Sequence, residues 1–192
     1  MILKLFGTDL ETTGFDADDG HMVTEIAISI VKLDTETMEA VDRKKWSTLV
    51  DPKRSIPQKV QEITGITPDM VKGAPEWHEI APKVKSIING CDVFVAHNAN
   101  FDAPFMYHMM NKVKLEMPDI EIFCTMQNGR WATPNGKVPK LAELCRACRI
   151  DFDEVSAHRA WYDTEKMMDA LIYGLKKGYF KLDLEELSCE TQ

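Results

Sequence analysis

Two acidic residues, Asp9 and Glu11, stand one residue apart in the stretch TDLETTG, at the end of the apolar segment 2–10. Alternate residues of a β-strand project from the same face, so both carboxylates should point to one side of a sheet. Placing two like charges side by side is costly unless a cation lies against them. The stretch therefore indicates a cation site, and an exposed strand end with solvated acids is the simpler alternative.

Two further acids could complete such a site. Asp102 follows the short apolar run 92–96, where α/β sheets usually place ligands, although it could equally cap the next helix. Asp163 lies on the apolar side of the predicted helix 160–175, where an unpaired carboxylate would be costly, and Arg159 offers a local ion pair. Carboxylates without a Cys/His cluster are typical of Mg²⁺ or Mn²⁺ sites. We therefore expect a hard divalent cation.

Zinc is the alternative offered by Cys145 and Cys148. This pair lies in an apparent helix, and no second pair has matching spacing, so two buried thiols are the more typical outcome. The five cysteines show no spacing typical of secreted disulfides, and free thiols are expected.

His158 precedes Asp163 by five residues. On one continuous helix the two side chains would be about 140° apart and would point away from each other. If His158 lies in the loop before the helix, its imidazole can reach the acidic site, where a histidine suits the role of general base. A surface histidine without a catalytic role is the alternative.

The elements that must position these residues change in character along the chain. The first part is strand-like with short connections, which is typical of an antiparallel meander. The predicted strands of this part are 2–10, 25–33 and a third that ends at 46–50. Helices and short strands then alternate: a helix start at 67–69, a regular helix from about residue 79, a strand 92–96, a helix 103–113, a strand 120–124, and helices 140–147 and 160–175. This order predicts an α/β fold with a mixed sheet and flanking helices.

Composition places the chain among globular proteins. Its 192 residues, 44% of them hydrophobic and 28% charged, suffice for one domain with a sizeable core. The net charge of −8 argues against a nonspecific nucleic-acid coat, although the six Lys and Arg of residues 130–159 could form a local basic surface. No signal peptide or membrane-spanning run is visible, so a cytoplasmic location is expected.

Three stretches, TDLETTG, VAHNANFD and AHRAWYDTE, resemble the motifs of the DEDDh class of 3′→5′ exonucleases, and IPQKVQEITGITPDMV and PKLAELC fit the same order. This DnaQ-like class includes the epsilon subunit of bacterial DNA polymerase III and ribonuclease T. The resemblance covers residues 2–175 and implies a ribonuclease H-like fold. It divides the chain into an exonuclease domain, 1–175, and a short C-terminal tail, 176–192.

The resemblance also implies roles for the four acidic residues and for His158. Asp9, Glu11, Asp102 and Asp163 would hold two divalent cations, Mg²⁺ or Mn²⁺, and Asp9 would bridge them. His158 would be the general base that accepts a proton from the attacking water.

Contacts with the terminal nucleotide are implied by the same resemblance. The candidate residues are Thr12, Thr13, Gly14, Phe15, Thr64, Asn98 and Phe101. Phe15 would stack against a base, and a core phenylalanine is nearly as good an explanation. Many relatives have histidine at the position of Thr64, and the chain also departs from the usual pattern in the bulk of Trp161. Asn98 is expected to shape its loop and Phe101 to lie partly in the core.

The implied activity is metal-dependent hydrolysis at free 3′ ends, with release of nucleoside 5′-monophosphates. Single-stranded DNA is the expected substrate, and an exoribonuclease of the ribonuclease T kind is the alternative, because the motifs are common to both. A noncatalytic docking subunit should have lost one of the five chemical residues, and all five are present. A DNA polymerase is a candidate partner and a membrane is not. The implied source is bacterial or phage-encoded, with a stand-alone nuclease favoured over a replicase subunit.

Overall fold

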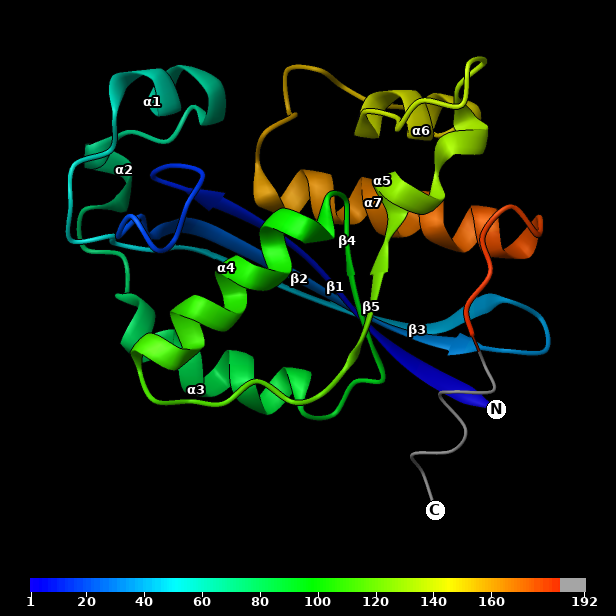
Figure 1. Cartoon of the computed structure of the whole chain (residues 1–192), viewed down its shortest axis with the longest axis horizontal. Coiled ribbons are helices and arrows are strands. Elements are labelled where there is room, and N and C mark those ends of the chain that lie inside the picture. Colours follow the sequence, from blue (N-terminus) through cyan, green and yellow to red (C-terminus); the bar gives the residue numbers. More distant parts are fainter. Residues whose placement is uncertain (184–192) are drawn as a thin grey trace.

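A five-stranded mixed sheet runs through the protein in the order β3-β2-β1-β4-β5 (Figure 1). The computed structural model describes residues 1–183. β1 (Ile2–Thr12), β2 (Val23–Asp34) and β3 (Glu39–Leu49) form the antiparallel meander. β4 (Val93–Ala96) and β5 (Glu121–Cys124) extend it in parallel beside β1. The predicted mixed α/β sheet is therefore confirmed.

The sequence predicts only the end of β3, at 46–50, and the structure shows that the strand begins at Glu39. Its residues from Glu39 to Lys45 are largely polar or charged, and β3 is an edge strand. Charged side chains on an edge strand discourage pairing with other molecules, but they also hide the apolar alternation that signals a strand.

Helices cover both faces of the sheet. They are α1 (Gln58–Thr64), α2 (Pro68–Val71), α3 (Trp77–Ile88), α4 (Ala99–Lys112), α5 (Thr125–Asn128), α6 (Leu141–Ala147) and α7 (Ala160–Lys176), with a 3-10 turn at Arg130–Ala132. One core lies between the sheet and the helices α3 and α4, and a second lies between the opposite face and α6 and α7 (Figure 1). None of the helices in the described part of the chain is both long enough and apolar enough to cross a bilayer.

Three helix starts differ from the sequence prediction. The seven-residue helix α1 was not predicted, because its stretch is mainly polar. The helix α3 begins at Trp77 even though Pro82 lies inside it, because a reciprocal cap between Glu76 and Glu79 closes its first turn. The helix α4 begins at Ala99, earlier than the predicted residue 103.

Strand alternation decides which face the first acidic residues occupy. Leu5 packs in the core beneath α7 and Phe6 packs in the opposite core, as period-two side chains must. Gly7 brings β1 so close to α7 that a Cβ there would clash with Met168. Asp9 and Glu11 share the face of Leu5 and Gly7, so they project toward α7.

The chain continues past α7 and folds back onto it. Phe180 is buried against Gly174, and its ring meets that of Phe123 edge-on at a centroid distance of 5.6 Å. The boundary between domain and tail at residue 175 stays a prediction. Residues 184–192 of the predicted tail lie outside the described residues.

Candidate functional site

Three of the four predicted metal ligands come together at the end of β1. Asp9 and Glu11 approach from β1, and Asp163 approaches from the first turn of α7. Each can offer one carboxylate oxygen such that all three oxygens lie within 4.8 Å of one another. The alternation of side chains in β1 and the helical periodicity of α7 thus place Asp9, Glu11 and Asp163 on surfaces that face each other.

Asp102 lies beside this cluster without joining it. The residue is buried in the first turn of α4, and its Oδ1 accepts a hydrogen bond of 3.2 Å from the backbone N–H of Leu10. Leu10 lies between Asp9 and Glu11 in β1. The bond therefore fixes the Asp102 carboxylate next to the acidic cluster, from the opposite side of the strand to Asp163.

Burial raises the pKa values of these carboxylates, and neighbouring negative charges add to the effect at Asp9 and Glu11. Burial raises the pKa of Glu11 to about 9, with a further contribution from the charge of Asp163. Burial also raises the pKa of Asp102 to about 8 and that of Asp163 to about 6. The pKa of Asp9 is well above its usual range, because of burial and then because of the charge of Asp102. A nearby cation would relieve this repulsion.

The donor set fits a hard divalent cation. Asp163 Oδ1 is buried and has no hydrogen-bond partner among the described residues, whereas its Oδ2 accepts the backbone N–H of His158 at 3.1 Å. A buried carboxylate oxygen without a partner is costly, and ligation to a cation would satisfy it. The cluster contains carboxylate oxygens alone, which is the ligand type of Mg²⁺ and Mn²⁺ sites.

His158 lies in the loop before α7 and not on the helix. The helix begins at Ala160, and His158 is exposed with a φ of 61°. This positive φ turns the chain so that the His158 N–H points at Asp163, as its hydrogen bond requires. The charge of His158 also lowers the pKa of Asp163. The structure thus places His158 in the loop and not on the helix, and its role as general base stays a prediction.

A groove of about 350 Å³ begins at Glu11 and runs toward α1. Six of the predicted substrate-binding residues line it: Thr12, Thr13, Gly14, Phe15, Thr64 and Phe101. The Phe15 side chain is 87% exposed, so the alternative of a core phenylalanine is wrong. Lys59 and Ile63 of α1 form part of the wall.

Side-chain hydroxyls hold the turn that forms this groove. Thr12 Oγ1 donates to the carbonyl of Gly14 at 2.6 Å. Thr13 Oγ1 accepts the backbone N–H of Met22 at 3.0 Å and lies 3.1 Å from Nδ1 of His21. The His21 ring fills the space beside Gly14, where no Cβ would fit. The two threonines thus fix the turn that lines the groove.

The remaining candidate residues have mainly structural contacts. The Thr64 hydroxyl donates to the carbonyl of Val60 and accepts from the N–H of Ile66, at 3.0 and 3.1 Å. Asn98 precedes α4 with a φ of 90° and makes no side-chain cap. Its backbone conformation shapes the loop, and the Phe101 ring packs against that of Phe105 at a centroid distance of 5.5 Å and an interplanar angle of 46°.

Sequence reasoning missed a fifth carboxylate at the site, that of Glu25. This residue is buried and stands directly opposite Glu11 in the β1–β2 register. Its two oxygens accept hydrogen bonds of 3.0 and 2.9 Å from the Arg159 guanidinium. The available signal was a lone acid in the predicted strand EIAISIVKL, where an apolar residue would be typical.

Cys145 and Cys148 are buried against α7. Their thiols donate to the carbonyls of Lys166 and Ala170, each at 3.8 Å. Burial raises the pKa of Cys145 to about 12 and that of Cys148 to about 11, so both stay protonated. Among the described residues, neither thiol belongs to a group of three or more side chains that could hold a metal ion, so the interpretation as two buried thiols is favoured.

Comparison with known proteins places this site in a family. The model of the RNase_T family, described as "Exonuclease", matches residues 6–171. The chain belongs to this exonuclease family. It is 30% identical over 157 residues to the "3'-5' exonuclease DinG" of Bacillus subtilis, which covers 82% of this chain and 16% of that protein. It is 35% identical over 181 residues to the "DNA polymerase III PolC-type" of Clostridium perfringens, which covers 93% of this chain and 12% of that protein.

Solved structures agree with the fold. Exonuclease X in complex with 5′ overhanging duplex DNA is 25% identical, with a TM-score of 0.65, and the match covers 97% of this chain and 99% of that one. The zinc ion bound form of the E. coli ExoI–ssDNA complex has a TM-score of 0.75 at 15% identity, over 92% of this chain and 41% of that one. The exonuclease fold implied by the sequence motifs is confirmed.

Proposed function

We propose that this domain hydrolyses the last phosphodiester bond at a free 3′ end of single-stranded DNA and releases nucleoside 5′-monophosphates. The observation that carries the proposal is the meeting of Asp9, Glu11 and Asp163, with His158 on the adjacent loop. An open groove with an exposed aromatic ring leads directly to these carboxylates. This is the arrangement that a terminal nucleotide requires, with a surface for the base and an acidic centre at the phosphate.

The proposed cofactors are two divalent cations, Mg²⁺ or Mn²⁺. Asp9, Glu11 and Asp163 would hold them, and Asp102 would support the second position from the other side of β1. Bound there, such ions would help to activate water and to stabilise the leaving 3′-oxygen. The carboxylates supply negative charge that is held in place by the sheet and α7, and His158 accepts the proton of the attacking water.

DNA is proposed as the substrate because of what similar proteins bind. The exonuclease X and ExoI structures contain a duplex with a 5′ overhang and single-stranded DNA, respectively. A DNA polymerase is proposed as a partner because the matching regions of PolC-type polymerases lie in much longer chains. The cytoplasmic location stays a prediction.

Substrate and polarity can be tested together. Single-stranded DNA, duplex DNA and RNA of one sequence, each labelled at the 5′ end, would be offered with Mg²⁺ or Mn²⁺. A ladder of 5′-labelled products that shortens fastest on single-stranded DNA is expected. Faster shortening of RNA would favour the exoribonuclease, and intact substrates under every condition would overturn the proposal.

Replacing His158 by Ala should lower kcat by about 10²- to 10⁴-fold, because a general base contributes about that much. Mn²⁺ affinity, measured by calorimetric titration without nucleic acid, should stay within about threefold, because His158 is not a ligand in this account. The exposed His78 of α3 is the matched control, and its Ala variant should retain full turnover. A large loss of Mn²⁺ affinity in the His158 variant would show that the imidazole binds metal instead.

Replacing Phe15 by Ala should raise KM for single-stranded DNA by about tenfold, because one base–aromatic stack contributes about 1–3 kcal/mol. The exposed ring lines the groove and packs little against the fold, so the midpoint of thermal unfolding should hardly move. Val41, another exposed apolar residue on the edge strand β3, provides a control through Val41→Ala. An unchanged KM would remove Phe15 from the substrate site.

A further inference from the structure

The β1–β2 pair contains an unfavourable juxtaposition next to the acidic cluster. Glu11 and Glu25 are directly opposite each other in the antiparallel register, so their side chains share one face of the sheet. Like charges placed directly across a strand pair are destabilising. The strand pairing also shifts register between Glu11 and Thr12, immediately after this pair. A positively charged side chain is therefore needed beside these two residues, independently of any metal ion.

Arg159 supplies that cation. Its Nε and Nη2 donate to the two oxygens of Glu25 at 3.0 and 2.9 Å. This is the bidentate geometry that arginine forms with carboxylates. The Glu25 side chain is only 3% exposed, so the pair is shielded from solvent on that side. The charge of Arg159 also lowers the pKa of Glu11. Because its fork is committed to Glu25, Glu11 stays available to a divalent cation.

The same carboxylate caps the start of α7. Glu25 Oε2 accepts the backbone N–H of Ala160 at 3.1 Å, and Ala160 is the first residue of the helix. The first N–H groups of a helix lack partners within it, and a carboxylate there is favourable. A strand residue thus ties down the point from which α7 departs. His158 lies two residues before this point, and Asp163 lies three residues after it.

We propose that Glu25 and Arg159 are positioning residues, which hold the start of α7 so that His158 and Asp163 face Asp9 and Glu11. The inference rests on the function proposed above. Neither residue touches the reacting atoms in this account. Their effect is transmitted through two backbone anchors: the Ala160 N–H bound to Glu25, and the His158 N–H bound to Asp163.

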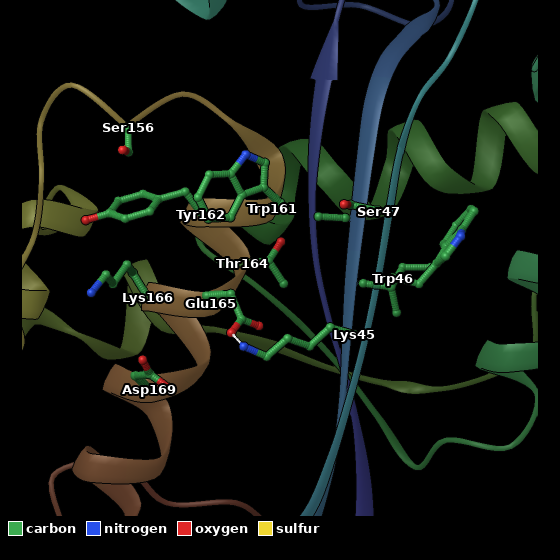
Figure 2. Close-up of a pocket in the computed structure, with 12 residues that line it drawn as sticks. Lys45, Trp46, Ser47, Ser156, Trp161, Tyr162, Thr164, Glu165, Lys166 and Asp169 are labelled. Atoms are coloured by element: carbon green, nitrogen blue, oxygen red, sulfur yellow. Dashed lines mark ion pairs between the residues drawn. The ribbon is translucent and has the colours of Figure 1, made fainter. Parts of the chain in front are cut away.

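A second ion-pair network on the same helix provides a matched control. Arg43 of β3 donates to Ser29, to Asp169 at 2.5 Å and to the carbonyl of Glu165, and its guanidinium also lies 3.3 Å from the Glu165 carboxylate. Lys45 pairs with Glu165 beside it (Figure 2). These contacts tie α7 to the sheet one or two turns further along the helix. Loss of Arg43 should therefore weaken the fold without disturbing the start of α7.

The experiment compares Glu25→Ala, Arg159→Met, the double variant and Arg43→Met. The first two should each lower kcat by at least about tenfold while KM changes by less than about threefold. The double variant should lose no more than about twofold beyond the worse single variant, because both residues form one unit. Arg43→Met should lower the midpoint of thermal unfolding about as much as Glu25→Ala and Arg159→Met do. It should nevertheless keep kcat within about twofold of the parent. Arg159→Lys, which keeps the charge and loses the fork, should fall between the parent and Arg159→Met.

A readout without substrate keeps the inference separate from the proposed function. Amide hydrogen exchange at His158 and Ala160 should be at least about tenfold faster in Glu25→Ala and Arg159→Met, but unchanged in Arg43→Met. Unchanged exchange in the first two variants would overturn the positioning role, and so would an equal loss of kcat in Arg43→Met. A parent protein that hydrolyses no nucleic acid, combined with the expected exchange pattern, would contradict the proposed function alone.

Discussion

Replacing Asp163 by Asn is expected to reduce turnover on single-stranded DNA by roughly 10⁴-fold, because the change removes one ligand from a unit that works as a whole. Asp163 closes the cluster from α7, and its Oδ1 has no other partner among the described residues. Steady-state turnover with Mn²⁺ is the measurement. Retention of more than about a tenth of the parent kcat would contradict the assignment of Asp163 as a ligand.

Asp169 is the matched control for this substitution. It lies on the same helix, and its carboxylate binds Arg43 outside the acidic cluster. Asp169→Asn should retain turnover, although it loses an ion pair. The Asp163→Asn protein should also be at least as stable as the parent in EDTA at pH 8, because burial already disfavours the charged form of Asp163 and raises its pKa to about 6.

Removal of divalent cations should lower the unfolding midpoint as well as abolish activity. A ligand present at about 100 times its Kd stabilises the folded protein by about 2.7 kcal/mol. For a domain of this size that corresponds to a shift of roughly 5–10 °C between EDTA and saturating Mn²⁺. Thermal unfolding followed by circular dichroism is the measurement. Asp163→Asn should show a smaller shift, and Asp169→Asn should show the full one.

The size of this shift should depend on pH in a definite direction. The pKa values of Glu11, Asp102 and Asp163 are raised to about 9, 8 and 6, above the values near 4 of an unfolded chain. Between about pH 4 and pH 9 the folded metal-free protein therefore binds more protons than the unfolded chain. Its stability falls as pH rises through this range. Protons and cations compete for the same oxygens, so the gain from Mn²⁺ should increase from pH 6 to pH 8. A gain that is constant over this range would contradict the assigned electrostatics.

Local periodicity was sufficient to predict much of the site. Alternation in β1 placed Asp9 and Glu11 on one face, and the apolar stripe of α7 placed Asp163 on the surface that meets them. The five-residue spacing between His158 and Asp163 left a position on the helix and a position in the loop before it open, and the structure places His158 in the loop. These inferences succeeded because each depends on neighbours within a few residues.

The parts that escaped prediction depend on contacts between distant segments. Glu25 and Arg159 are 134 residues apart in the chain, and neither residue type reveals its partner. The exposure of Phe15 depends on Thr12 and Thr13, whose hydroxyls hold the turn through local bonds and through contacts to His21 and Met22. The packing of α4 beside Leu10 of β1 likewise decides where the Asp102 carboxylate lies. Sequence periodicity carries no information on such packing.

The most direct test of the central claim is to follow oxygen in the reaction. Single-stranded DNA would be hydrolysed in ¹⁸O-labelled water with Mg²⁺, and the released mononucleotides would be analysed by mass spectrometry. Attack of water on the terminal phosphorus predicts nucleoside 5′-monophosphates with one ¹⁸O in the phosphate, and shortened DNA that ends in a 3′-hydroxyl. Asp163→Asn protein should release none. Products with a 3′-phosphate, internal fragments or unlabelled mononucleotides would contradict the proposed reaction at this site.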